Sequence, residues 1–180
     1  GTRVVVRGAG FLLNNEMGDF NWYPGLTTRS GKIGTEANLL APGKRMLSST
    51  SPTIVKRDGI VVLLTGSPGG RTIINTVSGI LVQTLFFDRP LAEAVEGPRI
   101  HHQWLPDVIE IEPDESLDWQ QLLSELQSKG HEVEMSPRRG GRQGSAHSIS
   151  VDPETHLMTG VADWRRGGRA LGVEHRKTQD

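Results

Sequence analysis

The stretch "TGSPGG" (Thr65 to Gly70) joins an apolar run to an amphipathic segment. A helix leaves its first backbone amides without intrahelical partners and carries partial positive charge at its N-terminus. Gly69 and Gly70 bring no side chain that would block these amides, and Pro68 stiffens the turn. The pattern predicts backbone donors that face an anion or a developing oxyanion, although such glycines could equally form only a tight strand-to-helix turn.

Known glycine motifs do not fit this stretch. It lacks the lysine of a phosphate-binding P-loop, and it matches neither G-x-G-x-x-G nor the G-x-S-x-G nucleophile elbow. Ser67 is therefore a poor candidate nucleophile. The turn alone does not decide the function.

Other polar residues are open to more than one interpretation. Without further context, Glu16 and Asp19 in "NNEMGDF" are a solvated carboxylate pair, and Ser48 and Ser49 belong to a serine-rich turn. The neighbouring residues His101 and His102 should face opposite ways in an extended segment, and no metal-ligand spacing surrounds them. We expect structural roles for both histidines, with no metal and no cofactor.

The elements that position these residues follow from turn signals and periodicity. Short strands are expected in "TRVVVRG" and "GFLLNN", before a long polar loop over residues 19–47. The run "TIVKRDGIVVLL" predicts a hairpin that turns at Asp58 and Gly59.

A helix should begin near Gly69 or Gly70, because apolar residues then recur at helical spacing. They are Ile73, Ile74, Val77, Ile80, Leu81 and Leu85. A shorter helix is expected at "PLAEAVEG". Strands are expected at "VIEIE" and "HEVEM", and between them "SLDWQQLLSELQSKG" predicts a helix with a serine N-cap and Gly130 past its end.

The chain should close with a hairpin across Asp152 and Pro153, followed by a loose tail over residues 165–180. Hairpins mixed with a few helices favour an α+β domain with a mainly antiparallel sheet. At 180 residues, the length fits one domain over 1–180.

Composition excludes several classes of function. Lys and Arg number 20 against 21 Asp and Glu, and no long basic run is present, so nucleic acid is an unfavoured partner. The apolar runs are of strand length, so no membrane span is expected. The absence of cysteine excludes disulfides, thiolate zinc sites and a cysteine nucleophile.

Four motifs in series resemble the small subunit of γ-glutamyltranspeptidases: "LLNNEMGDF", "LSSTSPTI", "TGSPGG" and "GPRIHHQWLPD". The likeness continues through "GSAHSISV" to about Asp163. It implies part of a four-layer αββα N-terminal nucleophile hydrolase, whose precursor cuts itself into two subunits. It also implies cleavage of γ-glutamyl amides such as glutathione, with transfer of the γ-glutamyl group to water or to an amino acid or peptide amine.

The resemblance assigns roles to six residues. Glu16 and Asp19 match the carboxylates that hold the substrate α-ammonium. Ser48 and Ser49 match the hydroxyls that bind its α-carboxylate, aided by an arginine of the large subunit. Gly69 and Gly70 match the oxyanion hole, which would stabilise charge on the γ-carbonyl oxygen.

The nucleophile of the family is an N-terminal threonine in a "TTH" context, which this chain lacks. Thr2 lies beyond the strand pair that this threonine opens, so we expect it to be structural. The chain is thus expected to be a truncated small subunit that is inactive by itself, because this threonine is absent. The resemblance implies a periplasmic, secreted or cell-surface location.

Two alternatives stay open. A relative of cephalosporin acylases would use the same mechanism on a glutaryl substrate and would not need an ammonium clamp, so the presence of both Glu16 and Asp19 argues against it. A binding or structural domain derived from the family, without a nucleophile, is the second alternative.

Overall fold

The computed structural model describes residues 2–25, 27, 33–115, 118–136 and 143–173. The chain divides into two compact units. Unit 1 comprises Gly1–Ser48 and Trp104–Pro106, and unit 2 comprises Ser49–Gln103 and Asp107–Asp180. Each unit is described by itself, and a single domain over 1–180 stays a prediction.

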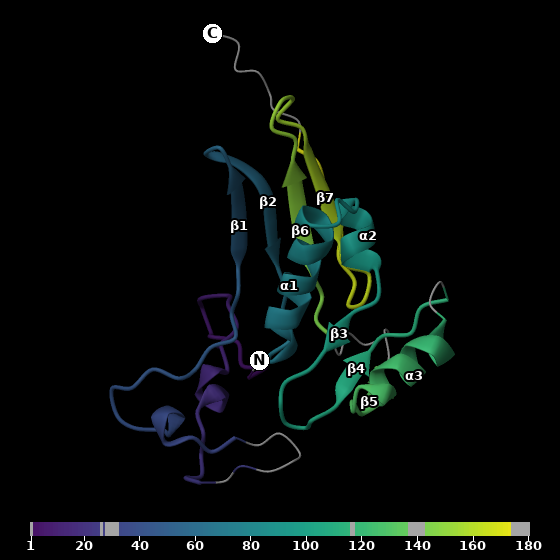
Figure 1. The fold of residues 1–180 in the computed structure, drawn as a ribbon. Coiled ribbons are helices and arrows are strands. Elements are labelled where there is room, and N and C mark those ends of the chain that lie inside the picture. Colours follow the sequence, from purple (N-terminus) through teal and green to yellow (C-terminus); the bar gives the residue numbers. More distant parts are fainter. Residues whose placement is uncertain (1, 26, 28–32, 116–117, 137–142, 174–180) are drawn as a thin grey trace. The chain divides into compact units, whose positions relative to one another are not determined.

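Unit 2 contains a four-stranded antiparallel sheet in the order β1-β2-β6-β7 (Figure 1). Its strands are β1 (Thr53–Arg57), β2 (Ile60–Gly66), β6 (His147–Val151) and β7 (Met158–Ala162). The predicted hairpin turn is confirmed, since Asp58 and Gly59 both have positive φ (51° and 84°), as tight hairpin turns require. The second hairpin, between β6 and β7, is confirmed as well.

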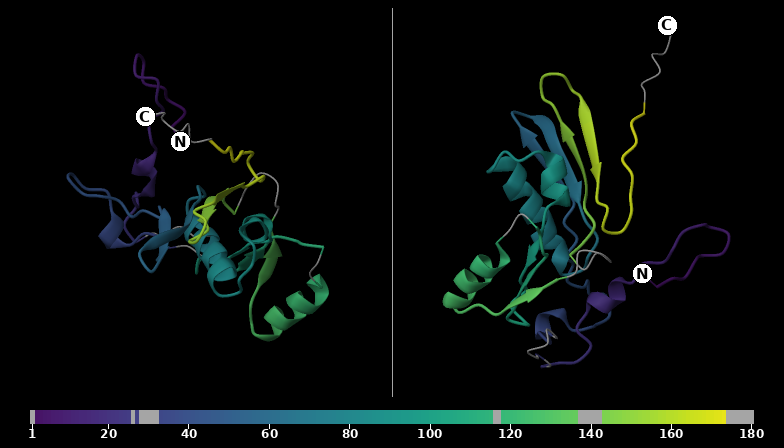
Figure 2. Two further views of the ribbon diagram at one scale, coloured as in Figure 1. Left: turned by 90° about the horizontal axis from the view of Figure 1, so that it is seen from above. Right: turned by 90° about the vertical axis from the view of Figure 1, so that its right-hand side faces the viewer.

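Two helices, α1 (Thr72–Leu85) and α2 (Leu91–Glu96), lie on the same side of this sheet (Figure 2). The core between helices and sheet consists of Leu63, Ile80, Leu91, Ala94, Val95 and Ala146. The predicted apolar face of α1 is buried at Val77 and Ile80, but Ile74 is 53% exposed, so its predicted burial is wrong. Helix α1 begins at Thr72 rather than at Gly69 or Gly70, because positive φ angles at both glycines lie outside the helical region.

The other face of the sheet carries an apolar groove of about 480 Å³. Ile54 of β1, Ile149 of β6 and Leu171 line it, and all three side chains are exposed. The part of unit 2 that the structure describes therefore buries one face of the sheet and leaves an apolar surface on the other.

A second sheet of unit 2 has the order β3-β4-β5. It consists of β3 (Ile100–His101), β4 (Ile109–Ile111) and β5 (Val133–Met135), with β4 and β5 parallel and linked through α3 (Trp119–Ser128). The Asp118 carboxylate caps α3 by accepting the Gln121 amide at 3.0 Å. The predicted serine cap is wrong, because Asp118 directly precedes the helix; Ser116 lies outside the described residues. Gly130 follows the helix with φ 88°, as predicted.

Unit 1 has little regular structure. The predicted strands at "TRVVVRG" and "GFLLNN" are reduced to one isolated bridge, Val5 to Leu12, because both side chains are exposed and no face is buried to extend the pairing. Two short 3₁₀ helices follow, η1 (Glu16–Asp19) and η2 (Glu36–Asn38). The predicted α+β class with mainly antiparallel sheets is confirmed.

Candidate functional site

The glycine turn connects the end of β2 at Gly66 to the start of α1 at Thr72. Gly69 and Gly70 have φ angles of 145° and 59°. Their carbonyls accept the first helix amides, from Thr72 and Ile73, both at 3.2 Å. Within the described part of the chain, neither glycine amide donates a hydrogen bond. The two N–H groups lie next to the N-terminus of α1, where backbone donors can bind an anion; their role as an oxyanion hole stays a prediction.

No side chain fits at Gly69. A Cβ atom there would lie 2.5 Å from the Thr72 Oγ1 and 3.1 Å from the Gly144 Cα. Gly144 is itself constrained, with φ 80°, and a Cβ atom there would collide with the Ser67 Oγ. The two glycine backbones therefore pack directly against each other.

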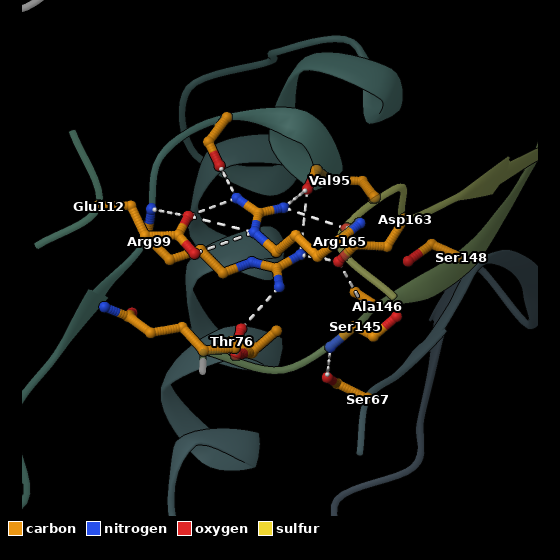
Figure 3. Close-up of polar contacts among 12 residues, drawn as sticks. Ser67, Thr76, Val95, Arg99, Glu112, Ser145, Ala146, Ser148, Asp163 and Arg165 are labelled. Atoms are coloured by element: carbon orange, nitrogen blue, oxygen red, sulfur yellow. Dashed lines mark hydrogen bonds and ion pairs between the residues drawn. The ribbon is translucent and has the colours of Figure 1, made fainter. Parts of the chain in front are cut away.

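The glycine turn is braced from the neighbouring strand. Because β2 and β6 are antiparallel neighbours, the residues after β2 lie beside those before β6. The Ser145 amide donates to the Ser67 Oγ at 2.9 Å (Figure 3), and the Ser67 hydroxyl donates to the Pro68 carbonyl at 2.7 Å. The hydroxyl proton of Ser67 is thereby held by a carbonyl and not by a general base.

A buried ionic cluster adjoins this segment, because the Ala146 amide donates to the Asp163 Oδ2 (Figure 3). It consists of Arg99, Glu112, Asp163 and Arg165, which are all at most 7% exposed. Asp163 pairs with Arg99 at 2.6 Å and with Arg165 at 3.2 Å, and Arg165 also pairs with Glu112. The prediction of a loose tail from residue 165 is wrong for Arg165, because two carboxylates and two backbone carbonyls bind its guanidinium group.

The cluster shifts the pKa values of its members. Burial alone would raise the pKa of Asp163, but the amide of Arg165 and the charge of Arg99 outweigh it and lower that pKa. Burial and the neighbouring charge of Arg165 lower the pKa of Arg99. For Arg165, burial is outweighed by the hydrogen bond and charge of Glu112, so its pKa is raised. Asp163 is therefore held in its ionised form.

The predicted ammonium clamp lies in unit 1, where Glu16 and Asp19 occupy the first and last positions of η1. Residues three apart eclipse each other in a 3₁₀ helix, so the two carboxylates are on one face. Glu16 is half-buried and Asp19 is exposed.

Asn38, which the sequence analysis missed, links several backbone segments of unit 1. Its Nδ2 donates to the Asp19 carbonyl at 2.7 Å, and its Oδ1 accepts the Leu47 amide at 2.8 Å. It thus ties the end of η1 to the residue just before Ser48. No local pattern marks it, because its partners are 19 and 9 residues away in sequence.

The predicted site residues are divided between the two units. Glu16, Asp19 and Ser48 belong to unit 1, whereas Ser49 and the glycine turn belong to unit 2. Ser48 is exposed, and Ser49 is half-buried, with its carbonyl accepting the Ser51 hydroxyl at 2.9 Å. Their assembly into one site stays a prediction.

The two neighbouring histidines face opposite ways, as expected. His101 is buried, with its ring nitrogens 3.1 Å from the Asn75 Oδ1 and 3.0 Å from the Gln103 Oε1. The His102 Nε2 is 3.0 Å from the Asp107 Oδ1. Among the described residues, no group of three or more His, Asp or Glu side chains could hold a metal ion.

Comparisons with known proteins agree with these features. The family model described as Gamma-glutamyltranspeptidase matches residues 1–173. The glutathione hydrolase proenzyme of Escherichia coli is 44% identical over 92% of the chain, and that of Pseudomonas aeruginosa is 44% identical over 96%. The chain spans only 27% and 30% of the lengths of these two relatives.

A solved structure gives the same result. The γ-glutamyltranspeptidase mutant W525D from Pseudomonas nitroreducens is 39% identical, with a TM-score of 0.79 over 97% of this chain and 87% of that chain. The fold is accordingly that of an N-terminal nucleophile hydrolase, and the chain corresponds to the small-subunit part. With the family model covering nearly its whole length, the chain belongs to the γ-glutamyltranspeptidase family.

Proposed function

We propose that the complete protein cleaves γ-glutamyl amides such as glutathione and transfers the γ-glutamyl group to water or to an amino acid or peptide amine. The observation that carries this proposal is the pair of backbone amides at Gly69 and Gly70, which donate no hydrogen bond among the described residues and lie just before α1 in a chain of this family. Attack on the γ-carbonyl carbon places negative charge on the carbonyl oxygen. A donor fixed toward that oxygen contributes about 2.7–4 kcal/mol to transition-state stabilisation.

The two ends of the γ-glutamyl group require opposite charges. The Glu16 and Asp19 carboxylates on η1 would bind the α-ammonium, and the Ser48 and Ser49 hydroxyls would donate to the α-carboxylate. This assignment supports a γ-glutamyl substrate over a glutaryl one, which lacks the ammonium.

The nucleophile in this proposal is the N-terminal threonine of the complete small subunit. Thr2 does not serve, because its hydroxyl donates to the Leu13 carbonyl at 2.9 Å across the first turn of unit 1. The α-amine of a terminal threonine can act as its own base. The large subunit of the same precursor would supply the arginine for the α-carboxylate.

The apolar groove on the open face of the four-stranded sheet supports a large-subunit partner, since a second sheet would bury it. None of the described helices is long and apolar enough to cross a membrane. We propose a periplasmic, secreted or cell-surface location on the basis of family membership.

The test is an assay of the complete precursor with γ-glutamyl-p-nitroanilide, run together with N-terminal sequencing of the processed chains. Release of nitroaniline by a two-chain product that begins with threonine would support the proposal. A glutaryl-p-nitroanilide control separates the acylase alternative, which predicts equal or faster glutaryl turnover. Failure of the processed protein to release nitroaniline from either substrate would contradict a catalytic function.

A further inference from the structure

We infer that Ser67 is a positioning residue for the oxyanion hole, fixing the direction of the Gly69 N–H through the Pro68 carbonyl. The inference rests on the proposed function, because it concerns how the donor of that reaction is held. Ser67 does not touch the reacting atoms in this assignment. It fixes the orientation of the peptide group between Pro68 and Gly69.

Peptide geometry carries the first step. The Pro68 carbonyl and the Gly69 N–H belong to the same planar trans peptide, in which they point in opposite directions. The Ser67 hydroxyl donates to this carbonyl at 2.7 Å. Fixing the carbonyl therefore fixes the N–H. The same hydrogen bond polarises the peptide and makes the N–H a stronger donor.

The second step is the anchoring of Ser67 itself. Its Oγ accepts the Ser145 amide at 2.9 Å, so the hydroxyl is oriented by a residue 78 positions away. The next amide, from Ala146, donates to the Asp163 Oδ2 at 2.7 Å. Ala146 is fully buried. The hydrogen bonds that hold Ser67 are thus continuous with the buried core.

The segment before Ser145 is held equally firmly. The Gln143 carbonyl accepts from the Arg99 Nη1 at 2.7 Å and from the Thr76 Oγ1 at 3.1 Å. Thr76 lies on α1, so this segment connects the helix behind the glycine turn with the buried ionic cluster. Together these bonds place Ser145 where its amide meets Ser67.

Ser67 is therefore the last link between the ionic cluster and the first oxyanion donor. A flexible glycine turn would have to reorganise as charge develops, whereas a braced one presents its donor before reaction. Removing the hydroxyl should leave substrate binding intact and weaken only transition-state stabilisation.

The experiment compares Ser67→Ala, Ser67→Thr and the matched control Ser148→Ala in the complete, processed protein. Ser148 lies on β6, and its Oγ is 2.8 Å from the Thr65 Oγ1, within the same strand pair but away from the glycine turn. The kcat and KM for γ-glutamyl-p-nitroanilide are measured per processed enzyme, together with the thermal unfolding midpoint.

We expect Ser67→Ala to lower kcat by about 3- to 10-fold, the factor worth one net hydrogen bond, with KM within about twofold of wild type. Ser67→Thr should keep kcat within about twofold of wild type, because it keeps the hydroxyl. Ser148→Ala should lower the unfolding midpoint and leave kcat unchanged. If Ser67→Ala does not process, Ser67→Cys, a weak donor of similar size, should show the same kcat effect.

Three results would overturn the inference: wild-type kcat in the Ser67 variants without a hydroxyl, the same loss in Ser67→Thr as in Ser67→Ala, or the same loss in Ser148→Ala. A wild-type protein without γ-glutamyl turnover would instead contradict the proposed function. The two failures are therefore distinguishable.

Discussion

The two groups of predicted site residues are supported in different ways. In unit 1, Glu16 and Asp19 lie on a four-residue 3₁₀ helix, and the Asn38 side chain donates a hydrogen bond to the Asp19 carbonyl at the end of this helix. In unit 2, the glycine turn lies between a paired strand and a 14-residue helix, in front of a buried ionic cluster. The donors proposed for the reacting carbonyl are fixed by the core, whereas the carboxylates proposed for the substrate ammonium depend on local side-chain hydrogen bonds.

Removing the charge of Asp163 should have the largest effect. Asp163→Asn leaves Arg99 without its closest carboxylate, and breaking a buried pair in this way costs about 3–5 kcal/mol of stability. Since the pKa of Asp163 is lowered by folding, its contribution is complete above about pH 4 and is lost as pH falls through the folded pKa. Unfolding of both proteins at several pH values checks this. A stability gap that widens with acid would contradict the assignment.

Substitution of Gly69 in the proposed oxyanion hole should have the next largest effect. Gly69→Ala forces a Cβ to within 2.5 Å of the Thr72 Oγ1 at φ 145°, which must move the turn. We expect kcat to fall by about 10²- to 10³-fold. Gly79→Ala is the control, because its Cβ would meet nothing within 4 Å and alanine favours the helix. Similar activity in both variants would remove Gly69 from the proposed site.

The ammonium clamp should discriminate between substrates. Asp19→Asn is expected to lower kcat/KM for γ-glutamyl-p-nitroanilide by about 30-fold or more, since truncating a charge pair costs at least about 2 kcal/mol. Turnover of glutaryl-p-nitroanilide, which lacks the ammonium, should not fall. Glu36→Gln removes a carboxylate from η2 and serves as control. Unchanged γ-glutamyl turnover in Asp19→Asn would exclude this clamp.

Asn38 should give the smallest effect. Asn38→Ala removes the hydrogen bonds to the Asp19 carbonyl and the Leu47 amide. The bond to Asp19, which holds the proposed clamp, is worth about 1 kcal/mol, so KM should rise by about 5-fold with little change in kcat. Asn15→Ala, beside η1 and without a side-chain cap bond, is the matched control. A loss confined to kcat would show that unit 1 does not act through substrate binding.

Local signals predicted the parts of the fold that depend on neighbouring residues. The Asp58 and Gly59 turn, both hairpins and the glycine after α3 follow from residues close in sequence. The prediction of strands near Val5 and Leu12 is wrong, because the pattern of apolar residues shows a periodicity but not whether another element covers the apolar face.

The candidate site was predictable only in its motif residues. The glycine turn is visible in sequence because Gly69 and Gly70 are adjacent and precede a helical pattern. The contacts that support the turn are not visible in sequence, since the partners of Asp163 and Arg165 lie up to 70 residues away and the Ser145 partner of Ser67 lies 78 residues away. Ser67 and Ser145 become neighbours through the antiparallel pairing of β2 with β6.

The contact between Gly69 and Gly144 limits how this protein can evolve. A methyl group at either position would meet the backbone or side chain that belongs to the other segment. A larger residue at one position could not be offset by a smaller one at the other, because glycine is already the smallest. Random mutagenesis should therefore recover no compensated pair here, and directed evolution toward new acyl groups would have to proceed through other residues.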